Sequence, residues 1–155
     1  MHIDTVCFFG HRQIDNSIQV EERLEREVMR LIREREYIDF LIGRDGAFDL
    51  MAASVVRRAS KAAGLGNTHM TLVLPYMTAE YRDNTDAFHK YYDAVEICAA
   101  SASSHFKAAF QIRNREMVDR SDLVICCIQH RKGGAYQAVR YAEKCKIDTI
   151  NVGLI

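Results

Sequence analysis

Apolar and polar positions recur along the chain with two periods, one typical of strands and the other of helices. Short runs rich in apolar and β-branched residues predict six strands, at residues 3–9, 37–42, 69–74, 94–98, 123–128 and 148–152. Segments with apolar residues three or four positions apart predict helices at 18–35, 47–63, 86–92, 103–120 and 134–145. The polar, aperiodic stretch 76–85 predicts a loop.

Strand and helix alternate from one end of the sequence to the other. This alternation predicts an α/β fold, namely a Rossmann-like three-layer arrangement in which a mainly parallel sheet is flanked by helices. No repeat, low-complexity tract or linker interrupts the pattern, so residues 1–155 are expected to form one domain. Ligands of such folds bind beyond the carboxyl ends of the strands, near the point where the strand order reverses.

Charge and cysteine content narrow the range of functions. The chain has 21 Lys and Arg residues against 21 Asp and Glu residues, and this balance argues against nucleic acid as a partner. It has no apolar run long enough for a membrane span and no signal-peptide pattern at its start, so we expect a cytoplasmic protein without a membrane partner. The five cysteines form no CxxC pair and are expected to be reduced and buried. The histidines lack metal-ligand spacing, so we predict no metal site. We also predict no cofactor.

Three predicted strand ends combine glycine with a cation. The first, second and fifth strands are followed by Gly10-His11-Arg12, by Gly43-Arg44-Asp45-Gly46 and by Lys132-Gly133-Gly134-Ala135-Tyr136. Glycine lets a backbone approach a ligand closely, and the free N–H groups at a helix start suit an anion. A single glycine turn after a strand is common in loops that bind nothing. The three turns together predict a pocket for a phosphate-bearing small molecule. Neither the GxGxxG dinucleotide pattern nor a GxxxxGK[ST] P-loop is present.

Several polar residues near these turns have both a structural and a functional interpretation. Asp49 either binds free N–H groups at a helix start or accepts hydrogen bonds from ribose hydroxyls. Asp45 either stabilises a turn or binds the ligand, and His11 either positions a turn or serves as a base or donor. Asn114 can bind a ribose or a neighbouring loop, and Tyr136 can stack on a base or pack at the rim.

Four motifs occur in the same order as in YpsA-like proteins of the SLOG superfamily. Cys7-Phe8-Phe9-Gly10-His11-Arg12 resembles the opening strand of that family, which typically ends in Thr-Gly-His-Arg. Residues 43–53 are similar to its glycine-turn, Phe-Asp and Ala-Ala segment, and residues 113–122 to its Arg-Asn, Met-Val-Asp and Ser-Asp segment. Gly133-Gly134-Ala135, followed by residues 139–142, resembles its Gly-Gly-Thr and Tyr-Ala segment. The resemblance implies a Rossmann-like fold and a nucleotide pocket in which Arg113 reaches a phosphate or ribose.

The superfamily also suggests two alternative functions. LOG enzymes cleave the N-glycosidic bond of nucleoside 5′-monophosphates, and Smf/DprA proteins bind single-stranded DNA. Ala135 stands where threonine is usual, Ala138 where LOG enzymes carry the catalytic glutamate, and Ser54 where many relatives carry glutamate. These departures count against hydrolysis of the N-glycosidic bond. If the chain is an enzyme, its candidate catalytic residues are Arg113, Glu116 and Asp49.

The neutral charge counts against the DNA-binding alternative. LOG-like proteins often dimerise, so a homo-oligomer is a further alternative. We therefore expect a protein that binds or senses a nucleotide or a nucleotide-derived small molecule, held by residues 10–12, 43–49, 113–114 and 132–136.

Overall fold

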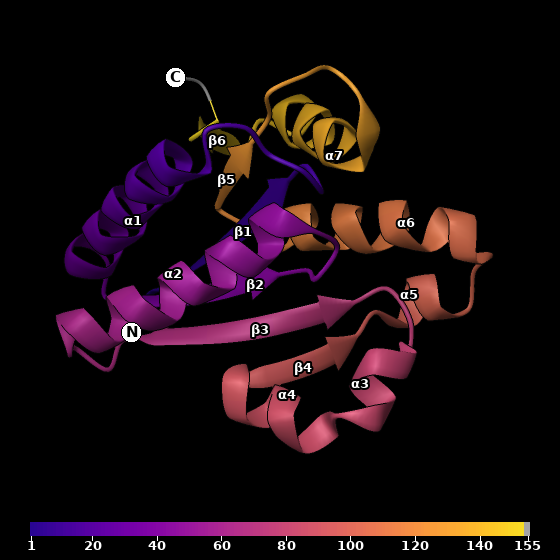
Figure 1. Cartoon of the computed structure of the whole chain (residues 1–155), viewed down its shortest axis with the longest axis horizontal. Helices are drawn as coiled ribbons and strands as arrows, with labels where there is room; N and C mark the ends of the chain where they lie inside the picture. Colours follow the sequence, from indigo (N-terminus) through magenta and orange to yellow (C-terminus); the bar gives the residue numbers. More distant parts are fainter. Residues whose placement is uncertain (154–155) are drawn as a thin grey trace.

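The computed structural model describes residues 1–153, which contain the six strands and five helices that the sequence pattern predicts together with two further short helices (Figure 1). Six strands form one sheet: β1 (Ile3–Gly10), β2 (Tyr37–Ile42), β3 (Thr68–Leu74), β4 (Ala94–Ile97), β5 (Leu123–Cys127) and β6 (Asp148–Asn151). The helices of this part of the chain are α1 (Ser17–Glu34), α2 (Ala47–Ala63), α3 (Ala79–Asp83), α4 (Thr85–Tyr91), α5 (Ala99–Ala102), α6 (Phe106–Asp119) and α7 (Gly133–Lys144).

The sheet has the strand order β4-β3-β2-β1-β5-β6, and every neighbouring pair is parallel. From β1 the chain adds β2, β3 and β4 on one side, and it then returns to add β5 on the other side of β1. The direction of winding therefore reverses between β1 and β5, where Gly10 pairs with Cys127 at the carboxyl ends of the two strands. The all-parallel sheet confirms the predicted α/β fold class.

Two apolar cores lie on opposite faces of this sheet, because successive strand residues point to opposite sides. Phe8 belongs to the core packed against α1 and α2, together with Leu24 and Phe48. Its neighbour Phe9 belongs to the core packed against α6 and α7, together with Met117. The sheet is thus covered on both faces, which gives three layers and explains the continuous apolar run in β5.

Three local predictions were wrong. The expected loop 76–85 contains α3, whose start is capped by Thr78: its Oγ1 accepts a hydrogen bond from the N–H of Tyr81 at 3.1 Å. The helix expected at 103–120 begins only at Phe106, and a separate short helix, α5, precedes it. Cys145, expected to be buried, is exposed just after α7.

The other four cysteines are buried free thiols, as expected. Burial raises the pKa of Cys7 and of Cys126 to about 12, so both thiols stay protonated at neutral pH. None of the helices in residues 1–153 is long and apolar enough to cross a bilayer.

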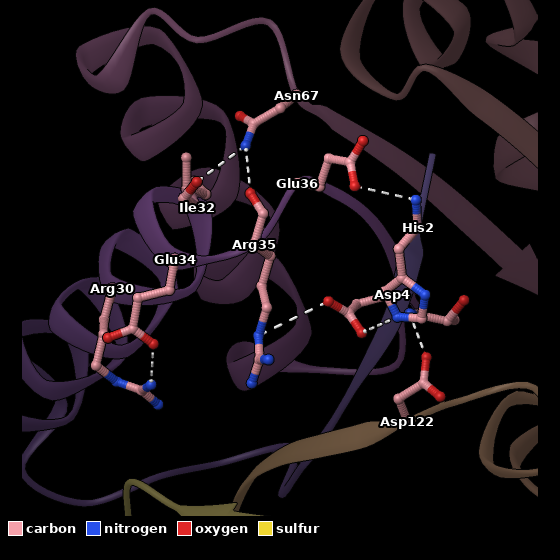
Figure 2. Close-up of polar contacts among 10 residues, drawn as sticks. His2, Asp4, Arg30, Ile32, Glu34, Arg35, Glu36, Asn67 and Asp122 are labelled. Carbon is pink, nitrogen blue, oxygen red and sulfur yellow. Dashed lines mark hydrogen bonds and ion pairs between the residues drawn. The ribbon is translucent and has the colours of Figure 1, made fainter.

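Polar side chains tie α1 to the amino ends of the strands (Figure 2). Asn67, next to the start of β3, donates from Nδ2 to the backbone carbonyls of Ile32 at 2.9 Å and of Arg35 at 3.2 Å. These carbonyls lie at the end of α1, where no further helical turn supplies a donor. Nearby, Asp122 Oδ2 accepts from the N–H of Thr5 at 2.8 Å. These contacts join the end of α1 to the start of β3, and the segment before β5 to β1, at the amino edge of the sheet.

Candidate ligand-binding site

A cavity of about 520 Å³ lies beyond the carboxyl ends of β1 and β5, where the winding of the sheet reverses. This is the place at which doubly wound α/β folds bind ligands. The residues that line the cavity come from both strand ends, from the loop after β2 and the start of α2, and from α6 and α7. They are Phe9, Gly10, His11, Arg12, Gln13, Asp45, Asp49, Phe110, Asn114, His130, Lys132, Gly133, Gly134 and Ala135.

Most residues singled out from the sequence converge on this cavity. It combines the turn after β1, the acidic residues beside the start of α2, Asn114 of α6 and the turn before α7. The lining does not include Gly43, Gly46, Arg113, Tyr136 or Glu116. The residues that sequence reasoning missed are Phe9, Gln13, Phe110 and His130. Phe110 lies four positions before Asn114 on α6, so helical periodicity was a signal that could have found it.

The N-terminus of α7 opens directly into the cavity. Lys132 precedes this helix and provides no side-chain cap. The backbone N–H groups of residues 133–135 donate to no other residue within 1–153. Gly133 has a φ of +93°, a conformation that favours glycine. Free N–H groups and the positive end of the helix dipole together favour an anion at this point.

His11 lies at the base of the cavity and is only 6% exposed. Its Nε2 accepts from the backbone N–H groups of Gln129 at 3.1 Å and of His130 at 3.3 Å. The ring stacks on that of His130, with centroids 3.7 Å apart and planes 8° apart. Burial and the proximity of His130 lower the pKa of His11. The ring is therefore neutral at pH 7, and because Nε2 accepts, the proton is on Nδ1.

A buried ionic cluster supports another part of the cavity lining, Asp45 and Asn114. Arg113 is 1% exposed, and its guanidinium donates to Asp45 Oδ2, to Asn114 Oδ1 at 2.9 Å and to the carbonyl of Val73 at 2.9 Å. These contacts use all three nitrogens of the guanidinium. Arg113 therefore holds Asp45 and Asn114, which line the cavity, and does not itself line it.

Asp49 joins this cluster from the first turn of α2. Its Oδ2 accepts from the backbone N–H of Asp45 at 2.9 Å. Burial, followed by the nearby charge of Asp45, raises the pKa of Asp49 to about 7, although the Asp45 N–H and Arg113 oppose the shift. Near neutral pH this carboxyl is a mixture of its protonated and ionised forms. It can donate or accept a hydrogen bond within the cavity.

Glycine is needed at three positions in two of these turns for packing. A Cβ on Gly43 would lie 3.0 Å from Asp49 Oδ2 and 3.2 Å from Arg113 Nη1, so glycine leaves room for the ionic cluster. A Cβ on Gly10 would lie 2.3 Å from the ring of Phe48, and one on Gly46 would lie 2.4 Å from Arg12 Cα. Gly10 and Gly46 thus permit the turn after β1 to pack closely against the start of α2.

Arg44, the cation of the predicted glycine turn after β2, does not line the cavity. Its Nε donates to Glu80 at 2.8 Å, its Nη1 donates to the Tyr92 hydroxyl at 3.0 Å, and its guanidinium lies 5.0 Å from the centre of the Phe88 ring. These partners belong to α3, α4 and the residue after α4, so the cation of the second turn holds the segment between β3 and β4. The cations that line the cavity are Arg12 and Lys132.

The arrangement favours an anionic, polar ligand. Within residues 1–153 no group of three or more His, Cys, Asp or Glu side chains is placed to hold a metal ion. The cavity combines the free N–H groups at the start of α7 and the nearby Lys132 with the carboxyls of Asp45 and Asp49 and the amide of Asn114, and Arg12 packs beside Gly46 at the start of α2. N–H groups and cations suit a phosphate, whereas carboxyls and an amide suit hydroxyl groups.

Comparison with known proteins shows what the fold is. No family model and no curated protein sequence matches the chain. The structure of DNA processing protein A from Helicobacter pylori, described for its single-stranded DNA binding mode, is similar with a TM-score of 0.65 and 16% identity, covering 94% of this chain and 63% of that one. DNA processing protein A from Streptococcus pneumoniae is similar with a TM-score of 0.68 and 15% identity, covering 95% of this chain and 49% of that one.

This chain therefore spans about half to two thirds of the length of those two proteins. At such low identity, structural similarity is evidence of a shared fold and not of a shared ligand. The chain has the Rossmann-like fold that is also found in DNA processing protein A.

Proposed function

We propose that the chain binds or senses a nucleotide or nucleotide-derived phosphate in the cavity between the ends of β1 and β5. One observation carries this proposal: the N-terminus of α7, which has no side-chain cap, opens into the same cavity as Arg12 and Lys132. The dipole and the N–H groups of α7 would bind the phosphate, and the two exposed cations would add charge-assisted hydrogen bonds.

The other polar groups of the cavity suit a ribose. Oδ1 of Asn114 accepts from Arg113, so the Nδ2 hydrogens of Asn114 are left for a ligand oxygen. Asp45 and Asp49 supply acceptors for hydroxyl groups, and the Nδ1–H of His11 supplies a donor. The motifs that resemble YpsA-like proteins include these positions, and that resemblance supports a nucleotide-derived ligand.

Ligand-dependent unfolding tests the proposal. The panel contains nucleoside mono-, di- and triphosphates, NAD, ADP-ribose and a short single-stranded oligonucleotide. A ligand at about 100 times its dissociation constant should stabilise the fold by about 2.7 kcal/mol. Lys132→Ala should reduce the shift, because it removes a cation beside the start of α7. Arg131→Ala is the matched control, since Arg131 is exposed beside it but does not line the cavity.

The panel also distinguishes a nucleotide site from the DNA-binding alternative. A salt-sensitive shift with the oligonucleotide alone would favour a DNA-binding module over a nucleotide site. The absence of a shift with every member of the panel would contradict the proposal. The balanced charge and the cavity volume of about 520 Å³ favour a small ligand.

Asp49 favours a second candidate function, an N-glycosidase acting on nucleoside monophosphates. A carboxyl with a pKa of about 7 that lines the cavity can protonate a leaving base as water attacks C1′ and the C1′–N bond breaks. Glu116 does not line the cavity and so serves as a control. Asp49→Asn should abolish release of free base from monophosphates, and Glu116→Gln should not. The lack of base release from all common monophosphates would exclude this function.

A further inference from the structure

His11 ties together two of the loops that form the cavity. It belongs to the loop after β1, and its Nε2 accepts hydrogen bonds from the backbone N–H groups of Gln129 and His130, in the loop between β5 and α7. The side chain of Gln129 joins the same two loops, because it accepts from the N–H of Asp15 at 2.8 Å and donates to the carbonyl of Asp15 at 2.7 Å. Helix α7 begins at Gly133, directly after this loop. The place of its N-terminus relative to β1 therefore depends on these contacts.

Only a neutral His11 ring can accept these two hydrogen bonds. A neutral imidazole has one nitrogen that accepts, whereas both nitrogens of a protonated imidazole carry hydrogen. Rotation of a protonated ring would not restore an acceptor. A proton on His11 would therefore leave the N–H groups of Gln129 and His130 facing another donor. Because unpaired donors inside a protein are unfavourable, the loop would move away from the ring.

The surroundings of His11 keep its ring neutral at neutral pH. The ring is almost completely buried and stacks on that of His130, so a proton on one ring repels a proton on the other. Burial and this neighbour lower the pKa of His11. Acidification is therefore needed to protonate the ring. The other charged side chains that line the cavity are those of Arg12, Lys132, Asp45 and Asp49.

The neighbouring groups would change the affinity for an anion in the opposite direction. Asp49, with a pKa of about 7, loses its negative charge as the pH falls. A proton on Asp45, on His130 or on His11 itself also makes the cavity more positive. Charge alone would thus strengthen the binding of an anion in acid. Weaker binding in acid is expected only where the loop before α7 leaves its place.

We propose that His11 is a positioning residue for the anion site at the start of α7, and that a proton on His11 releases the loop before α7 and lowers the affinity for an anion. The inference rests on the proposed function and adds to it a regulation by pH. His11 acts through the backbone of Gln129 and His130, and it needs no contact with the ligand. The site is then complete at neutral pH and is lost on acidification.

Titration with sulfate at several pH values tests the proposal. Sulfate stays a dianion throughout the titration, whereas a phosphate monoester has a second pKa of about 6 and would itself change charge. Binding is followed by the backbone amide signals of residues 133–135 in isotope-labelled protein. As the pH falls from about 7.5 to about 4.5, the affinity of the wild type should decrease by about tenfold or more, which corresponds to at least about 1.4 kcal/mol.

Three variants distinguish the position of the loop from the charge of the cavity. In His11→Gln the amide oxygen lies as many bonds from Cβ as Nε2 does, so it can accept the same N–H groups and does not titrate. This variant should bind sulfate as tightly as the wild type at neutral pH and should not weaken in acid. His11→Ala supplies no acceptor and should bind weakly at every pH. His130→Gln is the matched control: it removes the other histidine of the cavity but keeps its backbone N–H, so its binding should still weaken in acid.

A measurement without a ligand decides the matter if the buried His11 cannot be replaced. The ring nitrogens of His11 and the amides of Gln129 and His130 are followed by NMR while the wild type is acidified, and circular dichroism monitors the fold. Both amide signals should shift together with protonation of the ring. Amide signals that ignore this proton, or unfolding of the whole chain in step with it, overturn the proposal.

The sulfate titration also separates this inference from the proposed function. Binding to the wild type that is equal or tighter in acid overturns the role of His11 but leaves the anion site standing. Acid-weakened binding that persists in His11→Gln has the same meaning. The absence of sulfate binding at every pH overturns both proposals.

Discussion

The buried guanidinium of Arg113, on α6, donates a hydrogen bond to the carboxylate of Asp45, in the loop that follows β2. Helix α6 covers one face of the sheet, and the loop after β2 leads to α2 on the other face. The pair therefore joins the two outer layers of the fold across the carboxyl edge of the sheet. The cavity wall depends on a residue that does not line the cavity.

Removal of this arginine should be strongly destabilising. Arg113→Ala leaves Asp45, Asn114 Oδ1 and the Val73 carbonyl without their donor, and loss of one partner of a buried pair costs about 3–5 kcal/mol. Urea unfolding measures the change. Arg140→Ala, an exposed position on α7, should stay within about 0.5 kcal/mol of the wild type. A loss below about 1 kcal/mol in Arg113→Ala would contradict a structural role for the cluster.

Two glycines offer a matched pair of substitutions. Gly43→Ala places a methyl group 3.0 Å from Asp49 Oδ2, and overpacking of this kind costs about 1–3 kcal/mol. Gly134→Ala meets no atom within 4 Å and lies in a helix, so it should be neutral or stabilise by up to about 1 kcal/mol. Thermal unfolding of both variants checks the difference, and equal effects would show that the cluster tolerates a side chain at position 43.

Asp49 should make stability depend on pH. Its pKa is about 7 in the folded protein against an ordinary value of 3.8, so the folded state holds the proton more tightly. The resulting stabilisation is complete below about pH 4, decreases as the pH rises towards 7, and is absent above that. Asp49→Asn cannot titrate, so its stability relative to the wild type should increase over this interval, by at most about 1.4 kcal/mol per pH unit.

Unfolding of both proteins in urea at pH 4, 5, 6, 7 and 8 measures this difference. Titrating groups outside the cluster of Asp45, Asp49 and Arg113 contribute equally to both proteins, and their effects cancel in the comparison. A difference that is constant across the series would mean that the pKa of Asp49 is not raised.

Asn67 should stabilise the end of α1. Asn67→Ala removes two hydrogen bonds to helix carbonyls, each of which contributes about 0.5–1.5 kcal/mol, so unfolding should become easier by about 1–3 kcal/mol. Asn67→Asp should cost more, because it turns a carboxylate towards the carbonyls of Ile32 and Arg35. Chemical denaturation ranks the two variants, and a charged variant as stable as the wild type would rule out this contact.

Much of the fold could be predicted from local pattern. Strand β2 and helix α2 have the bounds that the apolar periodicity predicts, and Gly64 in the left-handed conformation ends α2. Helix α3 could not be predicted in this way because none of its residues is buried, and a helix without a buried face has no apolar period. Its start depends on a single cap at Thr78.

The sequence by itself determined the alternation of strands and helices, the glycine turns and the residue types available at the strand ends. The tertiary structure alone decided which turns meet, because strand order brings the end of β5 next to the end of β1. It also decided the direction of each side chain. Arg44 turns to Glu80, and Arg113 turns to Asp45, 36 and 68 residues away in sequence. Such pairs form because a buried or half-buried charge needs a partner, and only the folded chain brings that partner within reach.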